Sequence, residues 1–198
     1  MDPVIRYAEA EVPTEYGVVR TVVYRVGEGE PPEEHVALVI GDAASGDAPV
    51  LARVHSECWT GEVLHSRKCD CREQLDLALR RVSEAGRGVV VYLRQEGRGI
   101  GLGNKVRAYA LQNEGVDTVD ANRLLGFADD ARTYDVAASI LRELGVRRVA
   151  LMTNNPAKVQ GLVQCGIEVV ERVALKAEPN VHNAEYLAVK ARKMGHEL

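Results

Sequence analysis

Three of the chain's four cysteines, Cys58, Cys69 and Cys71, lie in the short stretch HSECWTGEVLHSRKCDCREQL. Thiolate sulfur is a preferred ligand of zinc, and a catalytic zinc site uses three protein ligands and leaves the fourth position for water. The spacing therefore favours an open, catalytic zinc site. Two other interpretations stay open: a structural site completed by Cys165 or His55, and three unrelated buried thiols. Structural sites usually pair their cysteines as C-x₂-C, and this stretch does not have that spacing.

Three thiolates around Zn²⁺ leave one net negative charge, so water bound there is acidified less than at a three-histidine site. A second group should therefore help with the proton, and Tyr109 and Glu57 are the candidates. Basic side chains near the cysteines, Arg67, Lys68 and Arg72, offset the negative charge in one interpretation. In the other interpretation they form an ordinary solvated face.

The segment RQEGRGIGLGNKVRAYALQ places Glu96, Arg98 and Lys105 among alternating glycines, between an expected buried strand and an expected helix. Its glycines do not follow the GxGxxG spacing, and the sequence contains no Walker A motif. A glycine-rich turn between a strand and a helix can still present backbone N–H groups to an anion. A plain tight turn is the alternative interpretation.

Two further segments stand at the starts of expected helices. FADDARTYD places Asp130 two residues before Arg132, an acid beside a guanidinium, although Asp and Thr are also common helix caps. TNNPAK follows an expected strand, at the position where α/β proteins bind ligands. Thr153, the helix N-terminus and Lys158 would suit a phosphate, while Asn-Asn-Pro is also a routine helix start.

Apolar runs and helical stripes predict the elements that must position these residues. The expected strands are residues 18–26, 35–41, 49–56, 88–93, 147–153 and 167–175. The expected helices lie around residues 75–82, 106–113, 136–144, 156–166 and 184–195. Gly86 and Gly145 are the expected helix stops. Strands that alternate with helices predict an α/β fold: a three-layer α/β/α core with a mixed sheet and a strand-rich N-terminal part.

The chain has 198 residues, 46% of them hydrophobic, and a formal net charge of −4. This length fits one domain, or two small ones in close contact. The acidic balance argues against broad affinity for nucleic acids or membranes, which are themselves anionic. The N-terminus lacks the features of a signal peptide, and no apolar stretch approaches the ~20 residues that span a bilayer. We therefore expect a cytoplasmic protein, where clustered cysteines more often bind metal or do chemistry than form disulfides.

Taken in order, the motifs HSEC…CDC, RQEGRGIGL.NK..AYALQ, D.R, TNNP.K and N..YL..K..KMGH strongly resemble GTP cyclohydrolase II over residues 50–198. That family opens the guanine ring of GTP at the first committed step of riboflavin biosynthesis. The resemblance implies release of formate and pyrophosphate, with 2,5-diamino-6-ribosylamino-4(3H)-pyrimidinone 5′-phosphate as the other product. It also implies a single domain over residues 1–198, GTP as the small-molecule partner, and a homodimer.

Site residues follow from the resemblance position by position. Cys58, Cys69 and Cys71 match the family's ligands for one catalytic zinc, whose activated water would attack carbon 8 of guanine before a second hydrolysis releases formate. The positions that match the family's GTP contacts are Arg53, Val54, His55, Ser56, Glu57, Gln74, Glu96, Gly97, Arg98, Thr118, Thr153 and Lys158. Within this set, Glu96 suits the amino edge of the base, and the cations Arg98 and Lys158 suit phosphates.

Three positions match the family's catalytic residues. Arg132 matches the residue proposed to attack the α-phosphorus, forming a guanylyl-enzyme and expelling pyrophosphate, and Asp130 matches the associated proton acceptor. Because the pKa of a guanidinium exceeds ~12, a purely electrostatic role for Arg132 is the alternative. Tyr109 matches the tyrosine that orients water for formate release. Mg²⁺ is expected to bridge the triphosphate.

Two residues depart from the family pattern R-C-D-C-G, since Lys68 replaces the arginine and Arg72 replaces the glycine. Lysine loses the bidentate fork of arginine, and arginine adds bulk where glycine permits positive φ. No metal ligand is lost, so zinc binding should survive, and the rate or completeness of deformylation is in question. The alternatives are a variant that stops at the formylated pyrimidine or acts on another purine nucleotide, and a non-enzymatic zinc-binding module.

Overall fold

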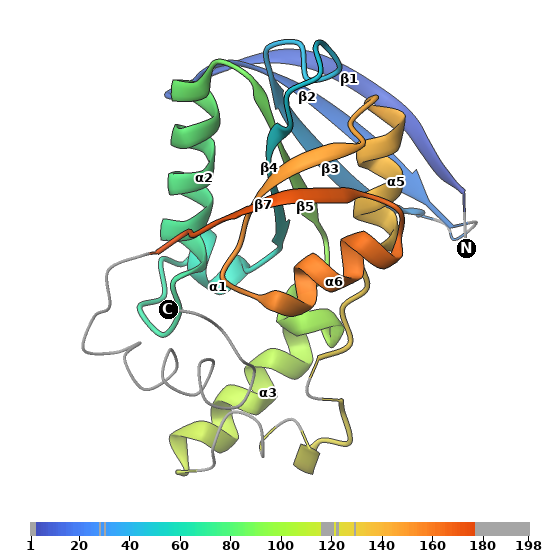
Figure 1. Ribbon diagram of the computed structural model, residues 1–198. Helices are drawn as coiled ribbons and strands as arrows, with labels where there is room; N and C mark the ends of the chain where they lie inside the picture. Colours follow the sequence, from blue (N-terminus) through green and yellow to red (C-terminus); the bar gives the residue numbers. More distant parts are fainter. Residues whose placement is uncertain are drawn as a thin grey trace.

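A seven-stranded mixed sheet runs through the part of the chain that the computed structural model describes, which is residues 3–27, 29, 31–115, 121, 123–128 and 130–176 (Figure 1). The strand order is β1-β2-β3-β5-β4-β6-β7. The strands are β1 (Val4–Thr14), β2 (Gly17–Val26), β3 (Glu33–Ile40), β4 (Val50–Ser56), β5 (Gly88–Leu93), β6 (Arg148–Met152) and β7 (Glu168–Val173). The helices are α1 (Trp59–Glu62), α2 (Cys71–Ala85), the 3₁₀ turn η1 (Glu96–Gly99), α3 (Gly101–Asn113), α5 (Asp135–Glu143) and α6 (Pro156–Gln164).

The first three strands form an antiparallel half. β1 pairs with β2 and β2 pairs with β3, and a tight turn at Gly17, with φ +97°, connects the first pair. Strand β1 was not predicted, because its alternating Ala and Glu residues have weak strand preference and its side chains are mostly exposed. Its long pairing with β2 forms the strand despite that preference.

The other half of the sheet is parallel, since β5 pairs with β4, β4 with β6, and β6 with β7 in the parallel sense. The carboxyl ends of these strands therefore meet at one edge. The segments that follow β4, β5 and β6 carry the predicted chemical motifs to that edge, where ligands bind in open α/β sheets. Figure 1 shows α3 lying beyond this edge, below the sheet.

Helices cover both faces of the parallel half, which confirms the predicted three-layer α/β/α fold. On one face α5 and α6 pack against the sheet through apolar residues such as Ile140, Leu141 and Leu162. On the other face α2 packs through Ala78 and Val82. Side chains of β5 alternate between the two faces of the sheet. Val89 and Val91 lie in the apolar cluster with α5 and α6, and Val90 lies in the cluster with α2.

Local signals set the helix boundaries where the sequence predicted them. Asn155 caps α6 by accepting a 2.9 Å hydrogen bond from the backbone N–H of Ala157, and Pro156 occupies the first turn. Gly86 ends α2 in the left-handed conformation, with φ 65°. The helix expected at residues 184–195 lies outside the described residues.

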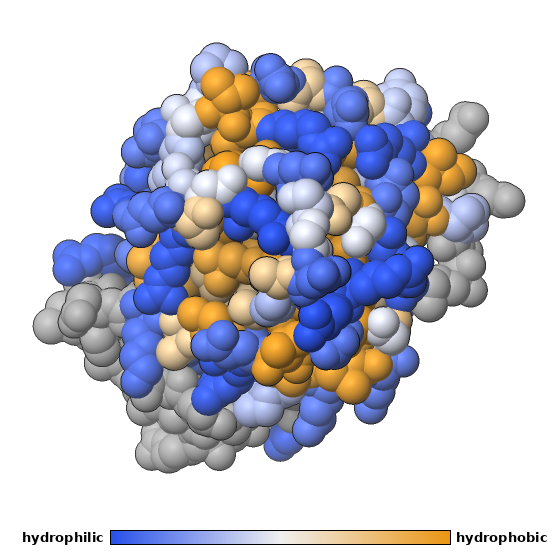
Figure 2. All heavy atoms as spheres, turned by 45° about the horizontal axis from the view of Figure 1, so that its top comes forward, coloured by the Kyte–Doolittle hydropathy of each residue, from blue (hydrophilic) through white to orange (hydrophobic). Residues whose placement is uncertain are grey.

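The surface carries no large separate apolar region in the view of Figure 2, where orange hydrophobic groups alternate with blue hydrophilic ones. Exposed large hydrophobic residues include Ile5, Tyr7 and Val18, all from the antiparallel half. Among the described residues, none of the helices has the length and apolar character needed to span a bilayer.

Candidate active site

A cavity of about 140 Å³ lies at the carboxyl ends of the parallel strands. The predicted site residues that line it are Arg53, His55, Ser56, Glu57, Cys58, Cys69, Cys71, Gln74, Glu96, Gly97, Arg98, Tyr109, Arg132 and Lys158. Val54, Thr153 and Asp130 are not among its lining residues, and Thr118 lies outside the described residues. The fold thus brings to one cavity residues that the chain separates by more than half its length.

Strand alternation explains which residues of β4 reach the cavity. Arg53 and His55 lie two residues apart and both line it, while Val54 between them points into the apolar core and is 1% exposed. Val54 contributes its backbone carbonyl instead, which accepts a 2.8 Å hydrogen bond from Lys158 Nζ.

The three predicted cysteines form one cluster, with their sulfur atoms all within 4.8 Å of one another. Cys58 is the N-cap of α1 and Cys71 is the first residue of α2, so two helix starts place them. The Cys58 and Cys69 sulfurs are 3.7 Å apart, close to the ~3.8 Å expected for tetrahedral sulfur ligands with Zn–S bonds of about 2.3 Å. Gly61 leaves room for them, since a Cβ there would lie 3.0 Å from Cys69 Sγ. The donor set and its spacing therefore fit zinc.

A fourth protein ligand does not join these sulfurs among the described residues. Cys165 ends α6 and packs against the apolar core instead. The Nε2 atom of His55 is 2.7 Å from Glu62 Oε1, so this ring nitrogen already has a carboxylate partner. The alternative interpretation, a four-ligand site completed by either residue, is therefore not supported, and the geometry is that of a three-sulfur site.

Cys58 and Cys69 have pKa values shifted in opposite directions. Hydrogen bonds from the Cys69 and Cys71 thiols lower the pKa of Cys58 despite burial, and the ammonium of Lys105 adds to this. The hydrogen bond to Cys58 raises the pKa of Cys69 to about 11. Burial alone would lower the pKa of Lys105, but the Cys58 thiolate and Glu96 outweigh it and raise that pKa.

Glu96 is buried and its carboxylate accepts three hydrogen bonds. The donors are the backbone N–H of Trp59 at 2.6 Å, that of Gly97 at 2.7 Å, and Lys105 Nζ at 2.8 Å. The η1 turn makes this possible, because Gly97 and Arg98 both adopt φ 63° and wrap the backbone around the carboxylate. Arg98 is one of only two non-glycine residues with positive φ in the described chain, which marks a strained turn at the site.

Arg53 of β4 lines the cavity and forms hydrogen bonds with β6 and α2. One guanidinium nitrogen donates to the carbonyl of Met152 at 2.8 Å and the other to the side chain of Gln74. Gln74 in turn donates to Asp70. Burial lowers the pKa of Arg53 to about 10, and Asp70 acts against that shift. A charged and a neutral donor are thereby held side by side at the cavity wall.

His55 has its orientation set by Glu62, which sequence reasoning did not identify. Glu62 also accepts hydrogen bonds from Tyr92 Oη and from the backbone N–H of Cys58. Burial lowers the pKa of His55 and prevails over the opposing effect of Glu62, so the ring is neutral. With the proton on Nε2, the Nδ1 atom is an acceptor, and it has no protein partner among the described residues.

Asp130 and Arg132 form an ion pair just before α5. Arg132 Nε donates to Asp130 Oδ1 at 2.8 Å, and a second guanidinium nitrogen donates to Oδ2. Burial would raise the pKa of Asp130, but Arg132 prevails and lowers it. The backbone N–H of Ala131 donates to the carbonyl of Arg98 at 3.1 Å, which ties this pair to the η1 turn.

In the TNNPAK segment, Thr153 forms a hydrogen bond within the chain, whereas Lys158 lines the cavity. Thr153 is 1% exposed, and its hydroxyl accepts from the backbone N–H of Asn155 at 3.1 Å. The side chain of Lys158 lines the cavity although it is buried. Thr153 therefore shapes the helix start, and Lys158 brings charge to the cavity.

The two departures from the family pattern lie in different surroundings. Arg72 lies in the first turn of the helix α2, where no positive φ is needed, and its Nε is 3.6 Å from Asp76 on an exposed face. Lys68 Nζ donates to Asn113 at 2.9 Å and lies 5.0 Å from the ring centroid of Tyr109. Arg72 therefore belongs to an ordinary solvated face. Lys68 instead contacts α3, the helix that carries Tyr109.

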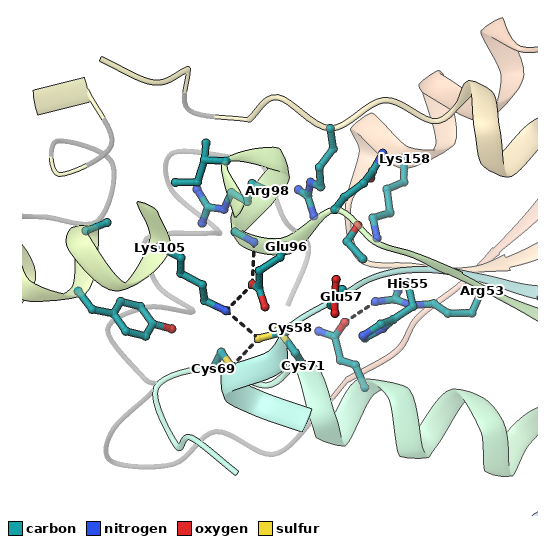
Figure 3. Close-up of a pocket in the computed structure, with 18 of the residues that line it drawn as sticks. Arg53, His55, Glu57, Cys58, Cys69, Cys71, Glu96, Arg98, Lys105 and Lys158 are labelled. Carbon is teal, nitrogen blue, oxygen red and sulfur yellow. Dashed lines mark hydrogen bonds and ion pairs between the residues drawn. The ribbon is translucent and has the colours of Figure 1, made fainter. Parts of the chain in front are cut away.

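Lys105 contacts a cluster sulfur, with its Nζ at 3.1 Å from Cys58 Sγ, and sequence reasoning had not placed it there (Figure 3). One signal was available, because Lys105 precedes Tyr109 by four residues and the two share a helix face. The other lining residues that were not predicted are Gln95, Ile100, Ala108 and Gln112.

The family model and the sequence relatives of this chain agree on one family. A family model described as GTP cyclohydrolase II matches residues 5–174. A protein named GTP cyclohydrolase-2 from Histophilus somni (strain 2336) is 57% identical over 189 residues, which cover 96% of this chain and 86% of that relative. One of the same name from Actinobacillus succinogenes is 54% identical over 198 residues, 100% of this chain and 90% of the relative. Among solved structures, a two-domain 3,4-dihydroxy-2-butanone 4-phosphate synthase from A. baumannii matches with a TM-score of 0.47 and 23% identity, over 88% of this chain and 40% of that one.

Proposed function

Since the chain belongs to the GTP cyclohydrolase II family, we propose that it hydrolyses GTP, opens the imidazole ring of guanine, and releases formate and pyrophosphate. The observation that carries this proposal is that one cavity is lined by both the three-cysteine cluster and Arg132. The reaction breaks bonds at two places in GTP, in the base and at the α-phosphate. In such a cavity, the cysteine cluster would hold a metal for the reaction at the base, and Arg132 would bind the phosphate for the reaction at the α-phosphate.

At the base end, Cys58, Cys69 and Cys71 would hold one zinc ion and leave its fourth position open. Zinc bound in this way supplies Lewis acidity and an activated water for attack at carbon 8 of guanine. Tyr109 is flanked by two ammonium groups, Lys68 at 5.0 Å and Lys105 at 5.9 Å from its ring centroid. The Tyr109 ring therefore lies in a cationic part of the cavity next to the sulfur cluster, which supports its proposed role in orienting water for formate release.

Guanine recognition would use groups that the protein has already oriented. His55 Nδ1 is an acceptor, while Arg53 and Gln74 bring donors to the same wall. Glu96 accepts three protein N–H groups, which leaves one acceptor position for the amino edge of the base.

At the phosphate end, Arg132, Arg98 and Lys158 provide positive charge, and Mg²⁺ would bridge the triphosphate. A covalent guanylyl-enzyme requires the Arg132 guanidinium to lose a proton to Asp130. The two-point ion pair with an ionised Asp130 opposes that loss, because it stabilises the protonated guanidinium. The geometry therefore supports an Arg132 that stabilises charge at the α-phosphate over one that attacks it.

The wider parts of the proposal rest on the family resemblance. They are a single domain over residues 1–198, a homodimer, and a cytoplasmic location in riboflavin biosynthesis. The acidic net charge of −4 supports the expectation that the protein does not bind nucleic acids or membranes broadly.

Product stoichiometry tests the proposed function. Zinc-loaded protein is incubated with GTP and Mg²⁺, and formate and pyrophosphate are quantified per GTP consumed. We expect one of each. Pyrophosphate with little formate would replace the proposal with a variant that stops at the formylated pyrimidine. A folded, metal-loaded protein that releases neither product would contradict it.

A further inference from the structure

Lys105 lies between the sulfur cluster and the buried carboxylate. Its Nζ donates to Cys58 Sγ at 3.1 Å and to Glu96 Oε1 at 2.8 Å, as the dashed lines in Figure 3 show. Its side chain is only 13% exposed. The ammonium therefore joins a sulfur of the cluster to a buried carboxylate, and the cluster has a cation at hydrogen-bond distance.

The surroundings hold this ammonium in place. Glu96 cannot turn away, because two backbone N–H groups, from Trp59 and Gly97, also bind its carboxylate. The stem of Lys105 packs closely against the η1 turn, where a Cβ at Gly97 would lie 3.2 Å from Lys105 Cβ. One side chain therefore joins α3 to η1 and to the start of α1.

The charge balance of the cluster gives this contact a chemical meaning. Three thiolates exceed the charge of Zn²⁺ by one, and electron-rich thiolates reduce the Lewis acidity of the metal they bind. A hydrogen bond to a ligating sulfur withdraws electron density from it, and such outer contacts tune metal sites. Arg72 does not have this position, since it pairs with Asp76 on an exposed face.

We propose that Lys105 is a positioning residue that acts through Cys58, cancelling the excess thiolate charge of the metal centre and raising the Lewis acidity of the zinc held there. Glu96 fixes its ammonium in the correct place. The inference rests on the proposed function for its effect on turnover, but the Lys105–Cys58 contact itself is tested without GTP.

The test uses the full chain with Co²⁺ in place of zinc, because thiolate-to-cobalt charge-transfer absorption reports the electron density on sulfur. In Lys105→Met the sulfur loses its N–H donor, so we expect the band to move to lower energy. Lys105→Arg keeps a charged donor and should retain most of the wild-type band position. Arg107→Met, which removes an exposed cation from the same helix, is the matched control and should leave the band unchanged.

Kinetics on the zinc-loaded variants separate this role from a merely structural one. We expect Lys105→Met to lower kcat for formate release about 10- to 100-fold, the usual effect of losing an outer contact of a metal ligand, with little change in KM for GTP. Lys105→Arg should recover much of the loss. A loss that falls mainly on KM, or that arginine does not relieve, would overturn the proposal.

Two outcomes keep the inference separate from the proposed function. An unchanged charge-transfer band in folded Lys105→Met would overturn the inference, even if wild-type protein releases formate normally. If wild-type protein releases no formate while the band shifts, the proposed function fails and the contact is confirmed. Should Lys105→Met not fold, Lys105→Leu, which also has neither a charge nor an N–H donor, undergoes the same measurements with the same criteria.

Discussion

Glu143 and Glu96 are both carboxylates held by a cation, but they lie in different regions of the molecule. Glu143 ends α5 beside the antiparallel half, where Arg6 of β1 donates to both of its oxygens at 2.9 Å and Tyr24 Oη donates to one of them. Glu96 lies at the carboxyl edge of the parallel half and binds Lys105. The same type of contact therefore occurs in both halves of the sheet.

The two clusters differ in where their contacts lead. The Glu143 cluster fastens β1 onto α5, and none of its members lines the cavity that holds the sulfurs. The Glu96 cluster continues through Lys105 to Cys58 and into that cavity. An ion pair by itself therefore identifies no active site. The Glu96 pair differs because it extends to a cluster of three sulfurs in a cavity.

Cys71→Ser should have the largest effect, because it removes a sulfur from the open site while the apolar core is untouched. We expect formate release to fall to the background of metal-free protein, with a substantial loss of bound zinc. Metal analysis and a formate assay measure both. Thermal unfolding is the control, since a variant that no longer folds would assign zinc a structural role as well.

Arg132→Ala should act on the other product. Loss of a cation that stabilises charge on a transferring phosphoryl group costs on the order of 10³-fold, so pyrophosphate release should fall by about that factor. Arg148→Ala, which removes an exposed arginine paired with Glu168, is the matched control and should be neutral. Pyrophosphate release at the wild-type rate would exclude both the covalent and the electrostatic role of Arg132.

Glu143→Gln should have the smallest effect and should change stability alone. Burial works to raise the pKa of Glu143, but hydrogen bonds from Arg6 and Tyr24 prevail and lower it below the ordinary 4.5. Because its pKa is lower in the folded state, Glu143 stabilises the fold at pH values above its unfolded-state pKa. This contribution disappears as the pH falls through the folded-state pKa.

Urea unfolding at neutral pH and at pH about 3 measures this contribution. At neutral pH we expect the variant to lose roughly 0.5 kcal/mol of unfolding free energy, because the pair is partly exposed and screened by solvent. The difference from wild type should shrink in acid, with formate release unchanged at neutral pH. A difference that grows in acid would refute the assigned direction of the pKa shift.

Much of the fold could be predicted because short-range chemistry determines it. Asn155 and Pro156 start α6, Gly86 ends α2, and the apolar run GVVVYL forms the buried strand β5. Strand β1 could not be predicted in this way, since its pairing with β2 outweighs its weak local preference. The cysteine cluster was predicted because its residue type and spacing carry the signal within one stretch.

The position of Lys105 depends on long-range geometry that no local pattern encodes. Its contact with Cys58 requires the left-handed backbone at Gly97 and Arg98, which turns Glu96 toward α3. Lys68 and Arg72 were candidates to offset the charge of the cluster because they are adjacent to the cysteines in the sequence. Proximity along the chain was a poor guide, since the cation at the sulfur comes from a different helix.

If the three sulfurs hold one zinc that formate release requires, removal of that metal must stop the reaction. Zinc is removed with a chelator, the protein is checked for folding, and formate release from GTP is measured before and after Zn²⁺ is restored. We expect metal-free protein to release no formate, and one zinc per chain to restore the full rate. Formate release at the full rate from folded, metal-free protein would contradict this expectation.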